Sequence, residues 1–145
     1  MELMAEHIRE HGLEKKPGLG ELLSYLRKNR IPAAVATATD KLRAEEYLQQ
    51  TGLLHYFSGI ICATMVENGK PKPDIYLFAA ARLGIKPQEC LALEDSPNGV
   101  FAASSAGCVT VMVPDLTEPD EEVLPLIYAS VKSLADVPAV IKQLS

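Results

Sequence analysis

Short, uniformly apolar runs alternate with helix-like segments along this chain. Apolar runs of four or five residues suit strands that are buried on both faces of a parallel sheet. The runs lie at residues 33–36, 59–63, 90–93 and 109–113, with a shorter candidate at 128–131. Strands that alternate with helices predict an α/β domain, in which helices cover both faces of a parallel sheet.

Segments with apolar residues at helical spacing separate these runs. They cover residues 2–11, 19–30, 40–52, 74–83, 99–105 and 136–144. Pro32 cannot continue the helix before it, and Gly84 stands just past the end of another. Asp136 can cap the last helix. The pattern therefore predicts both the kind and the order of the elements.

Charge and cysteine usage exclude several classes of partner. The net charge is −5 and no basic run occurs, which argues against a nucleic-acid surface. No apolar stretch is long enough to span a membrane, and residues 1–7 do not resemble a secretory signal. Cys62, Cys90 and Cys108 lie in or beside apolar runs and form no Cys-x-x-Cys pair, so we expect buried, reduced thiols in a cytoplasmic protein.

Polar residues follow three of the expected strands at the point where each strand ends. They are Thr37 and Thr39 after the first run, Lys70 after the second, and Glu94, Asp95 and Ser96 after the third. Hydroxyl and backbone N–H groups can hold phosphate oxygens, a lysine adds positive charge, and adjacent carboxylates suit Mg²⁺. Each residue alone is commonplace as a helix cap or a solvated charge. Their joint placement predicts a phosphoryl site with a metal ion, at the carboxyl edge of the sheet.

Three segments carry a more specific resemblance. The chain contains VATAT at 35–39, GKPKPDIY at 69–76 and LEDSPNGV at 93–100. These segments resemble the Ser/Thr, lysine and metal motifs of the haloacid dehalogenase (HAD) superfamily, in the form used by its β-phosphoglucomutase-like branch. The resemblance implies a three-layer, Rossmann-like HAD core. It also implies a phosphatase or phosphomutase that acts on small phosphate esters or sugar phosphates.

The resemblance assigns a role to each matching residue. Thr37 would hydrogen-bond the transferring phosphoryl group, helped by the Ala38 amide. Lys70 would neutralise charge on that group and on the nucleophile. Asp95 and Glu94 would ligate Mg²⁺, the cofactor that the resemblance implies.

The nucleophile of the family is missing from the sequence. The family's first motif is Asp-x-Asp, and no two of the aspartates in this chain are spaced by one residue. The resemblance therefore implies an N-terminally truncated protein, inactive alone and with weakened Mg²⁺ binding. We expect residues 1–16 to be a remnant of the helical cap and residues 17–145 to be an incomplete core that lacks the usual first, central strand.

The missing strand predicts a structural response. In the family it lies between the strand that ends at Thr37 and the strand that ends at Glu94, so its loss would leave a gap of roughly 10 Å. Unpaired backbone groups buried there would cost about 1–3 kcal/mol each. We expect the flanking strands to close up and pair, or a second chain to fill the slot in a strand-swapped homodimer.

Two hypotheses from different classes remain open. The chain is part of an enzyme that transfers phosphoryl groups from a small phosphorylated metabolite, or it is a non-catalytic phosphate-binding or regulatory domain. The hypothesis of a dinucleotide-binding domain has less support, because Gly18 and Gly20 form a Gly-x-Gly without a third glycine or a preceding strand. Mg²⁺-dependent hydrolysis of an aryl phosphate separates the first two hypotheses.

Overall fold

The structure is a computed structural model that describes residues 2–5, 17–37, 40–114 and 118–144, with only the backbone of residues 2–5. Its centre is a six-stranded sheet in the order β3-β2-β1-β4-β5-β6, in which every pairing is parallel. The strands are β1 (Glu2–Ala5), β2 (Ala33–Thr37), β3 (Gly59–Cys62), β4 (Cys90–Glu94), β5 (Val109–Met112) and β6 (Ala129–Ser130).

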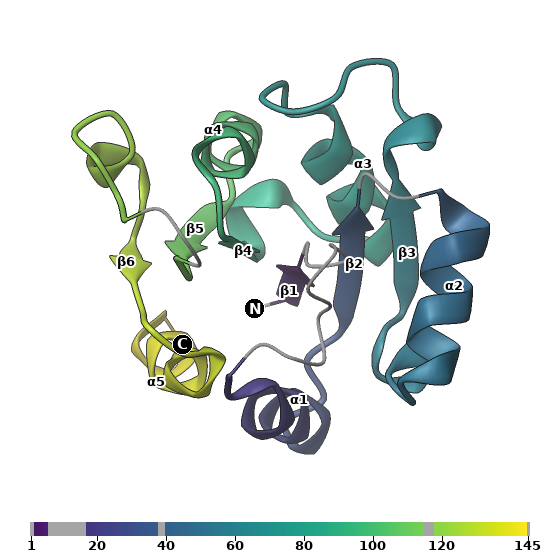
Figure 1. Ribbon diagram of the computed structural model, residues 1–145. Helices are drawn as coiled ribbons and strands as arrows, with labels where there is room; N and C mark the ends of the chain where they lie inside the picture. The colour runs from purple at the N-terminus through teal and green to yellow at the C-terminus, as the bar shows by residue number, and fades with distance from the viewer. Residues whose placement is uncertain (1, 6–16, 38–39, 115–117, 145) are drawn as a thin grey trace.

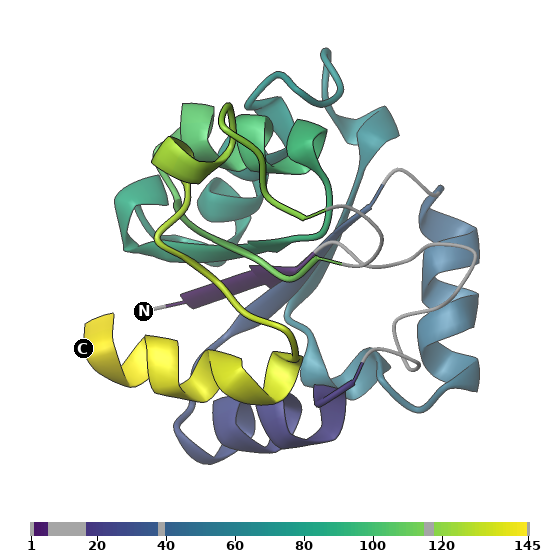
Figure 2. The same ribbon diagram turned by 60° about the vertical axis from the view of Figure 1, so that its left-hand side comes forward.

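Helices cover both faces of this sheet (Figures 1 and 2). One face carries α1 (Leu19–Lys28), α2 (Lys41–Gln50) and α5 (Val137–Leu144), and the other carries α3 (Asp74–Leu83) and α4 (Pro97–Ala106). The expected three-layer α/β core is confirmed. The expected bounds of α3 are confirmed to the residue, and Gly84 follows it with a φ of 76°.

Local sequence explains how these elements begin and end. The side chain of Asp40 accepts a hydrogen bond from the backbone N–H of Arg43 at 3.0 Å, which caps α2. In the same way Ser96 accepts from the N–H of Gly99 at 3.4 Å, so α4 begins two residues before the expected start. Pro97 then occupies the first turn, where its missing N–H costs nothing.

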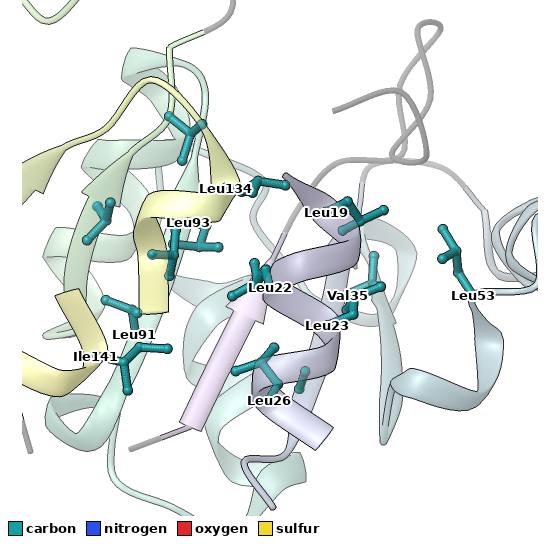
Figure 3. Close-up of a cluster of buried hydrophobic side chains, with 14 of the residues drawn as sticks. Leu19, Leu22, Leu23, Leu26, Val35, Leu53, Leu91, Leu93, Leu134 and Ile141 are labelled. Atoms are coloured by element: carbon teal, nitrogen blue, oxygen red, sulfur yellow. The ribbon is translucent and has the colours of Figure 1, made fainter. Parts of the chain in front are cut away.

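The larger core lies between the sheet and the layer of α1, α2 and α5 (Figure 3). Four leucines of α1 form one buried stripe: Leu19, Leu22, Leu23 and Leu26. They pack with Leu91 and Leu93 of β4 and with Ile141 of α5. Alternate residues of β4 face the opposite layer, where Cys90 and Ala92 join the smaller core around α3 and α4. Glu94 comes two residues after Ala92, so its side chain lies on the same face of the sheet, toward α3 and α4.

The central position of the sheet is filled by the chain itself. β1 pairs with β2 on one side (Leu3↔Ala33) and with β4 on the other (Leu3↔Leu91). The expectation that the gap does not stay empty is confirmed, the expectation that the flanking strands pair with each other is wrong, and the strand-swapped homodimer stays a prediction. β2 and β4 do not close up, and no second chain is needed, because four residues near the N-terminus satisfy the ladder groups of both neighbours.

The helix expected over residues 2–11 is wrong for residues 2–5, which form β1. A strand whose two neighbours are in place gains pairing on both sides, and this outweighs a weak local preference for helix. Residues 6–16 lie outside the described part of the chain. The assignment of residues 1–16 to a cap remnant stays a prediction, although the four that are described belong to the sheet.

The cysteines are buried thiols, as expected, and no disulfide bond joins them. Burial raises the pKa of the Cys62 thiol, and the nearby Asp40 carboxylate raises it further. The pKa of Cys108 is raised by a hydrogen bond with the Cys90 side chain and by burial. In the described residues, no helix combines the length and apolar character that a membrane crossing requires.

Candidate functional site

The carboxyl ends of β2 and β4 place the predicted site residues at one edge of the sheet. Thr37 is the last residue of β2 and is fully buried. Glu94 is the last residue of β4, and Asp95 follows it; they are 0% and 4% exposed. Polar side chains are seldom buried to this degree without a structural or chemical use.

A buried ion pair joins two of the predicted residues. The Lys70 Nζ lies 2.6 Å from Oε2 of Glu94, although 24 residues separate them in the sequence. The Glu94 side chain is fully buried, whereas 15% of the Lys70 side chain is exposed. The pair therefore holds a lysine ammonium at the surface end of β4, with its counter-ion underneath it.

Tyr76 contacts both members of this pair. Its hydroxyl donates a hydrogen bond to Oε2 of Glu94, and Lys70 Nζ lies 5.2 Å from the centre of its ring. Tyr76 is itself fully buried on the inner face of α3. The helix after the lysine loop thus fixes both the carboxylate and the direction from which the ammonium approaches it.

The first turn of α4 lies directly against the Glu94 carboxylate. A Cβ atom added at Gly99 would overlap the carboxylate carbon and oxygens. Only a residue without a side chain allows this approach. In front of the turn is an open hollow of about 530 Å³, lined by Lys70, Ser96, Pro97 and Asn98. A lysine and a helix N-terminus that face the same hollow make it electropositive.

Thr37 lies on the other side of β1 from this pair. Since neighbouring strands are about 4.8 Å apart, β2 and β4 are separated by roughly 10 Å at the edge where both end. Ala38, whose amide is predicted to help bind phosphate, lies outside the described residues. The structure therefore brings Lys70 and Glu94 into contact, and it places Thr37 across the β1 position from them.

The described residues do not by themselves fit a Mg²⁺ site. Mg²⁺ requires about six oxygen ligands in octahedral geometry. Among the described residues, no group of three or more His, Cys, Asp or Glu side chains is arranged to hold a metal. Glu94 also shares one of its oxygens with Lys70 and Tyr76. The assignment of Glu94 and Asp95 as metal ligands stays a prediction that needs further ligands.

Sequence reasoning missed two residues of this site. Tyr76 belongs to the lysine motif, but its contact with Glu94 depends on how α3 lies over β4. The sequence does contain a signal for this contact. Tyr76 lies on the apolar face of a helix, and a buried tyrosine hydroxyl needs a hydrogen-bond partner. The sequence indicates only a helix start at Gly99, and the close approach of the Glu94 carboxylate shows why this residue carries no side chain.

Comparison with known proteins gives consistent matches. The sequence profile of the haloacid dehalogenase-like hydrolase family matches residues 2–107. The "Probable pseudouridine-5'-phosphatase" of Drosophila melanogaster is 46% identical over 105 residues, which are 68% of this chain and 46% of that protein. The phosphorylated carbohydrates phosphatase of Thermotoga maritima is 41% identical over 95 residues, 66% of this chain and 44% of that protein.

A solved structure agrees with the fold. The crystal structure of the β-phosphoglucomutase from Clostridium difficile superposes with a TM-score of 0.75 at 29% identity, and covers 89% of this chain and 55% of that one. The chain thus spans about half the length of the curated relatives that it matches.

Proposed function

The chain belongs to the haloacid dehalogenase-like hydrolase family, and from this premise we propose that it forms the phosphate-receiving half of a phosphatase or phosphomutase site. The substrate is a small phosphorylated metabolite, such as a sugar phosphate, in the cytoplasm. The observation that carries the proposal is the Lys70 ammonium, held by buried Glu94 beside the first turn of α4 and facing an open hollow.

Each group has a part in binding a phosphoryl group. Lys70 supplies a positive charge that the Glu94 carboxylate and the Tyr76 ring keep in place. The N-terminus of α4 adds N–H groups and the positive end of the helix dipole. Thr37 supplies a hydroxyl from the other side of β1, and the Ala38 amide assists it. Together these groups stabilise negative charge that develops on a phosphoryl group between the strands.

This chain alone is proposed to bind phosphate without turning it over. Its sequence has no Asp-x-Asp motif, so it supplies neither the family's nucleophile nor the family's general acid and base. Mg²⁺ dependence is proposed only for a complete site. Glu94 and Asp95 would be two of its ligands, and the Asp-x-Asp motif of the family would supply others. The reason to expect a strand-swapped homodimer was an empty gap between β2 and β4, and β1 of the same chain fills that gap.

A chimera tests the proposal. The segment of the Thermotoga maritima phosphatase that precedes its match to this chain, where the family resemblance places the Asp-x-Asp motif, is fused ahead of residue 17. We expect the chain alone to release no p-nitrophenol from p-nitrophenyl phosphate, and the chimera to release it in a Mg²⁺-dependent manner. A chimera with the first aspartate of the added Asp-x-Asp motif replaced by asparagine is the matched control.

The same chimera identifies which residues carry the activity. Replacement of Lys70 by methionine should lower kcat/KM by about 10³-fold or more, because it removes the charge aimed at the phosphoryl group. Replacement of Lys72, an exposed lysine of the same loop, should leave kcat/KM within about twofold. An inactive but folded chimera, or equal effects of the two substitutions, would favour the non-catalytic alternative.

A further inference from the structure

A second hollow lies at the opposite edge of the sheet, where the strands begin. It encloses about 270 Å³ between the C-terminal half of α1, the turn before β2 and the segment before β3. We propose that this hollow binds a small organic anion with a flat apolar ring, such as an aryl phosphate or aryl carboxylate. The site is separate from the Lys70–Glu94 pair, and it does not depend on the function proposed for that pair.

The floor of the hollow is apolar. Leu23 and Leu26 of α1 line it, and they are 4% and 3% exposed. Ile31 and Tyr56 are half-buried and also pack against the main core. The two leucines are already covered, so the apolar surface that a flat ring could cover belongs to Ile31 and Tyr56.

The rim is cationic. Arg27 and Arg30 both line the hollow, together with His55. Among the described residues that line it there is no carboxylate, although the chain has 19 acidic and 14 basic residues. Two guanidinium groups with no acid beside them suit the planar, paired oxygens of a carboxylate or phosphate.

Ring contacts organise one wall of this hollow. Arg27 Cζ lies 5.0 Å from the centre of the Tyr56 ring, and the rings of His55 and Tyr56 have centroids 4.2 Å apart with an interplanar angle of 36°. The Tyr56 ring thus contacts both a guanidinium and an imidazole at the rim. A cation–π contact of this kind favours the position of Arg27 beside the hollow.

The backbone at Arg30 gives an independent reason. Arg30 has a φ of 56°, in the left-handed region that favours glycine, two residues after the end of α1. Glycine would serve the chain reversal better, so the fold itself does not require arginine at this position. An arginine in this backbone conformation is therefore a candidate for a use outside the fold.

The position of the hollow separates it from the phosphoryl site. Pro32 and Ser58, which line it, immediately precede β2 and β3, whereas Thr37 and Glu94 end their strands. A strand of five residues is roughly 16 Å long, so a ring-sized ligand cannot reach both edges. The two sites can therefore be altered independently.

Binding of phenyl phosphate to the chain and to its Lys70→Met variant, measured by isothermal titration calorimetry, tests the inference, because the proposed phosphoryl site also takes an aryl phosphate and the variant lacks its ammonium. We expect saturable binding that Arg30→Gly weakens about tenfold, while the same substitution raises or preserves the thermal unfolding temperature. Lys28→Ala is the matched control, because Lys28 is an exposed cation of the same helix end that does not line the hollow. We expect it to change the affinity by less than about twofold.

Three results would overturn the inference. The first is no saturable binding of phenyl phosphate up to millimolar concentration. The second is equal weakening by Arg30→Gly and Lys28→Ala, which indicates attraction by net charge alone. The third is binding that Lys70→Met abolishes and Arg30→Gly leaves intact, which places the ligand in the phosphoryl site. Failure of the chimera to turn over substrate affects none of these outcomes.

Discussion

Replacement of Lys70 by methionine would remove the positive member of a buried pair and leave the Glu94 carboxylate beneath it. The two charged atoms are 2.6 Å apart, and the carboxylate side chain is fully buried. Coulomb's law with an effective dielectric constant of 20 gives about 6 kcal/mol at this distance. Desolvation of both charges offsets roughly half of it, so we expect Lys70→Met to lower the free energy of unfolding by about 3 kcal/mol.

Urea unfolding followed by far-ultraviolet circular dichroism measures this loss. With a slope of about 2 kcal/mol/M, 3 kcal/mol corresponds to a midpoint lowered by about 1.5 M. Lys72→Met is the control, since Lys72 is exposed on the same loop, and it should change the free energy of unfolding by less than about 0.5 kcal/mol.

A double substitution tests the cause of the loss. Glu94→Gln together with Lys70→Met removes both charges, and the amide can still accept the hydrogen bond from Tyr76. We expect the double variant to be more stable than Lys70→Met alone, with a coupling free energy of at least about 1 kcal/mol. Additive effects of the two substitutions, or equal losses in Lys70→Met and Lys72→Met, would refute the reasoning.

Three other predictions follow from close contacts and buried thiols. Gly99→Ala should cost about 2–3 kcal/mol in urea unfolding, because the new Cβ meets the Glu94 carboxylate, and a loss below 0.5 kcal/mol would show that the carboxylate can move aside. Gly18→Ala should cost about 2 kcal/mol or more, because φ is 83° and the Cβ meets backbone, whereas unchanged stability would contradict this packing. The raised pKa values of Cys62 and Cys108 lower their thiolate fractions, so at pH 8 the native protein should react with a disulfide reagent far more slowly than the urea-unfolded chain. Equal rates in the two states would disprove the burial of these thiols.

Much of the fold follows from short-range patterns in the sequence. The local signals for α3 are Pro73 and the acidic Asp74 at its start and Gly84 after its end. The meeting of Lys70 with Glu94 was also predictable in outline, because both follow strands of one parallel sheet. The expected start of α4 is two residues late, because Ser96 caps the helix and Pro97 is its first residue.

The parts that sequence could not supply depend on contacts between distant segments. Residues 2–5 show no alternation strong enough to indicate a strand, and their pairing is decided by two neighbours that are themselves far along the chain. The contact of Tyr76 with Glu94 likewise requires knowledge of how one helix crosses one strand. Local patterns carry no information about such distances.

The two-sided pairing of β1 sets an order of events for a chain that emerges from a ribosome. Leu3 pairs with Ala33 across about thirty residues, but with Leu91 across almost ninety. Closing the longer loop costs about 1 kcal/mol more in chain entropy than closing the shorter one. At 5–20 residues per second, roughly 5 to 20 s pass between synthesis of β1 and synthesis of β4. During that interval the edge of β1 that later pairs with β4 has no partner. The nascent chain must therefore avoid pairing this edge with other strands until β4 is synthesised.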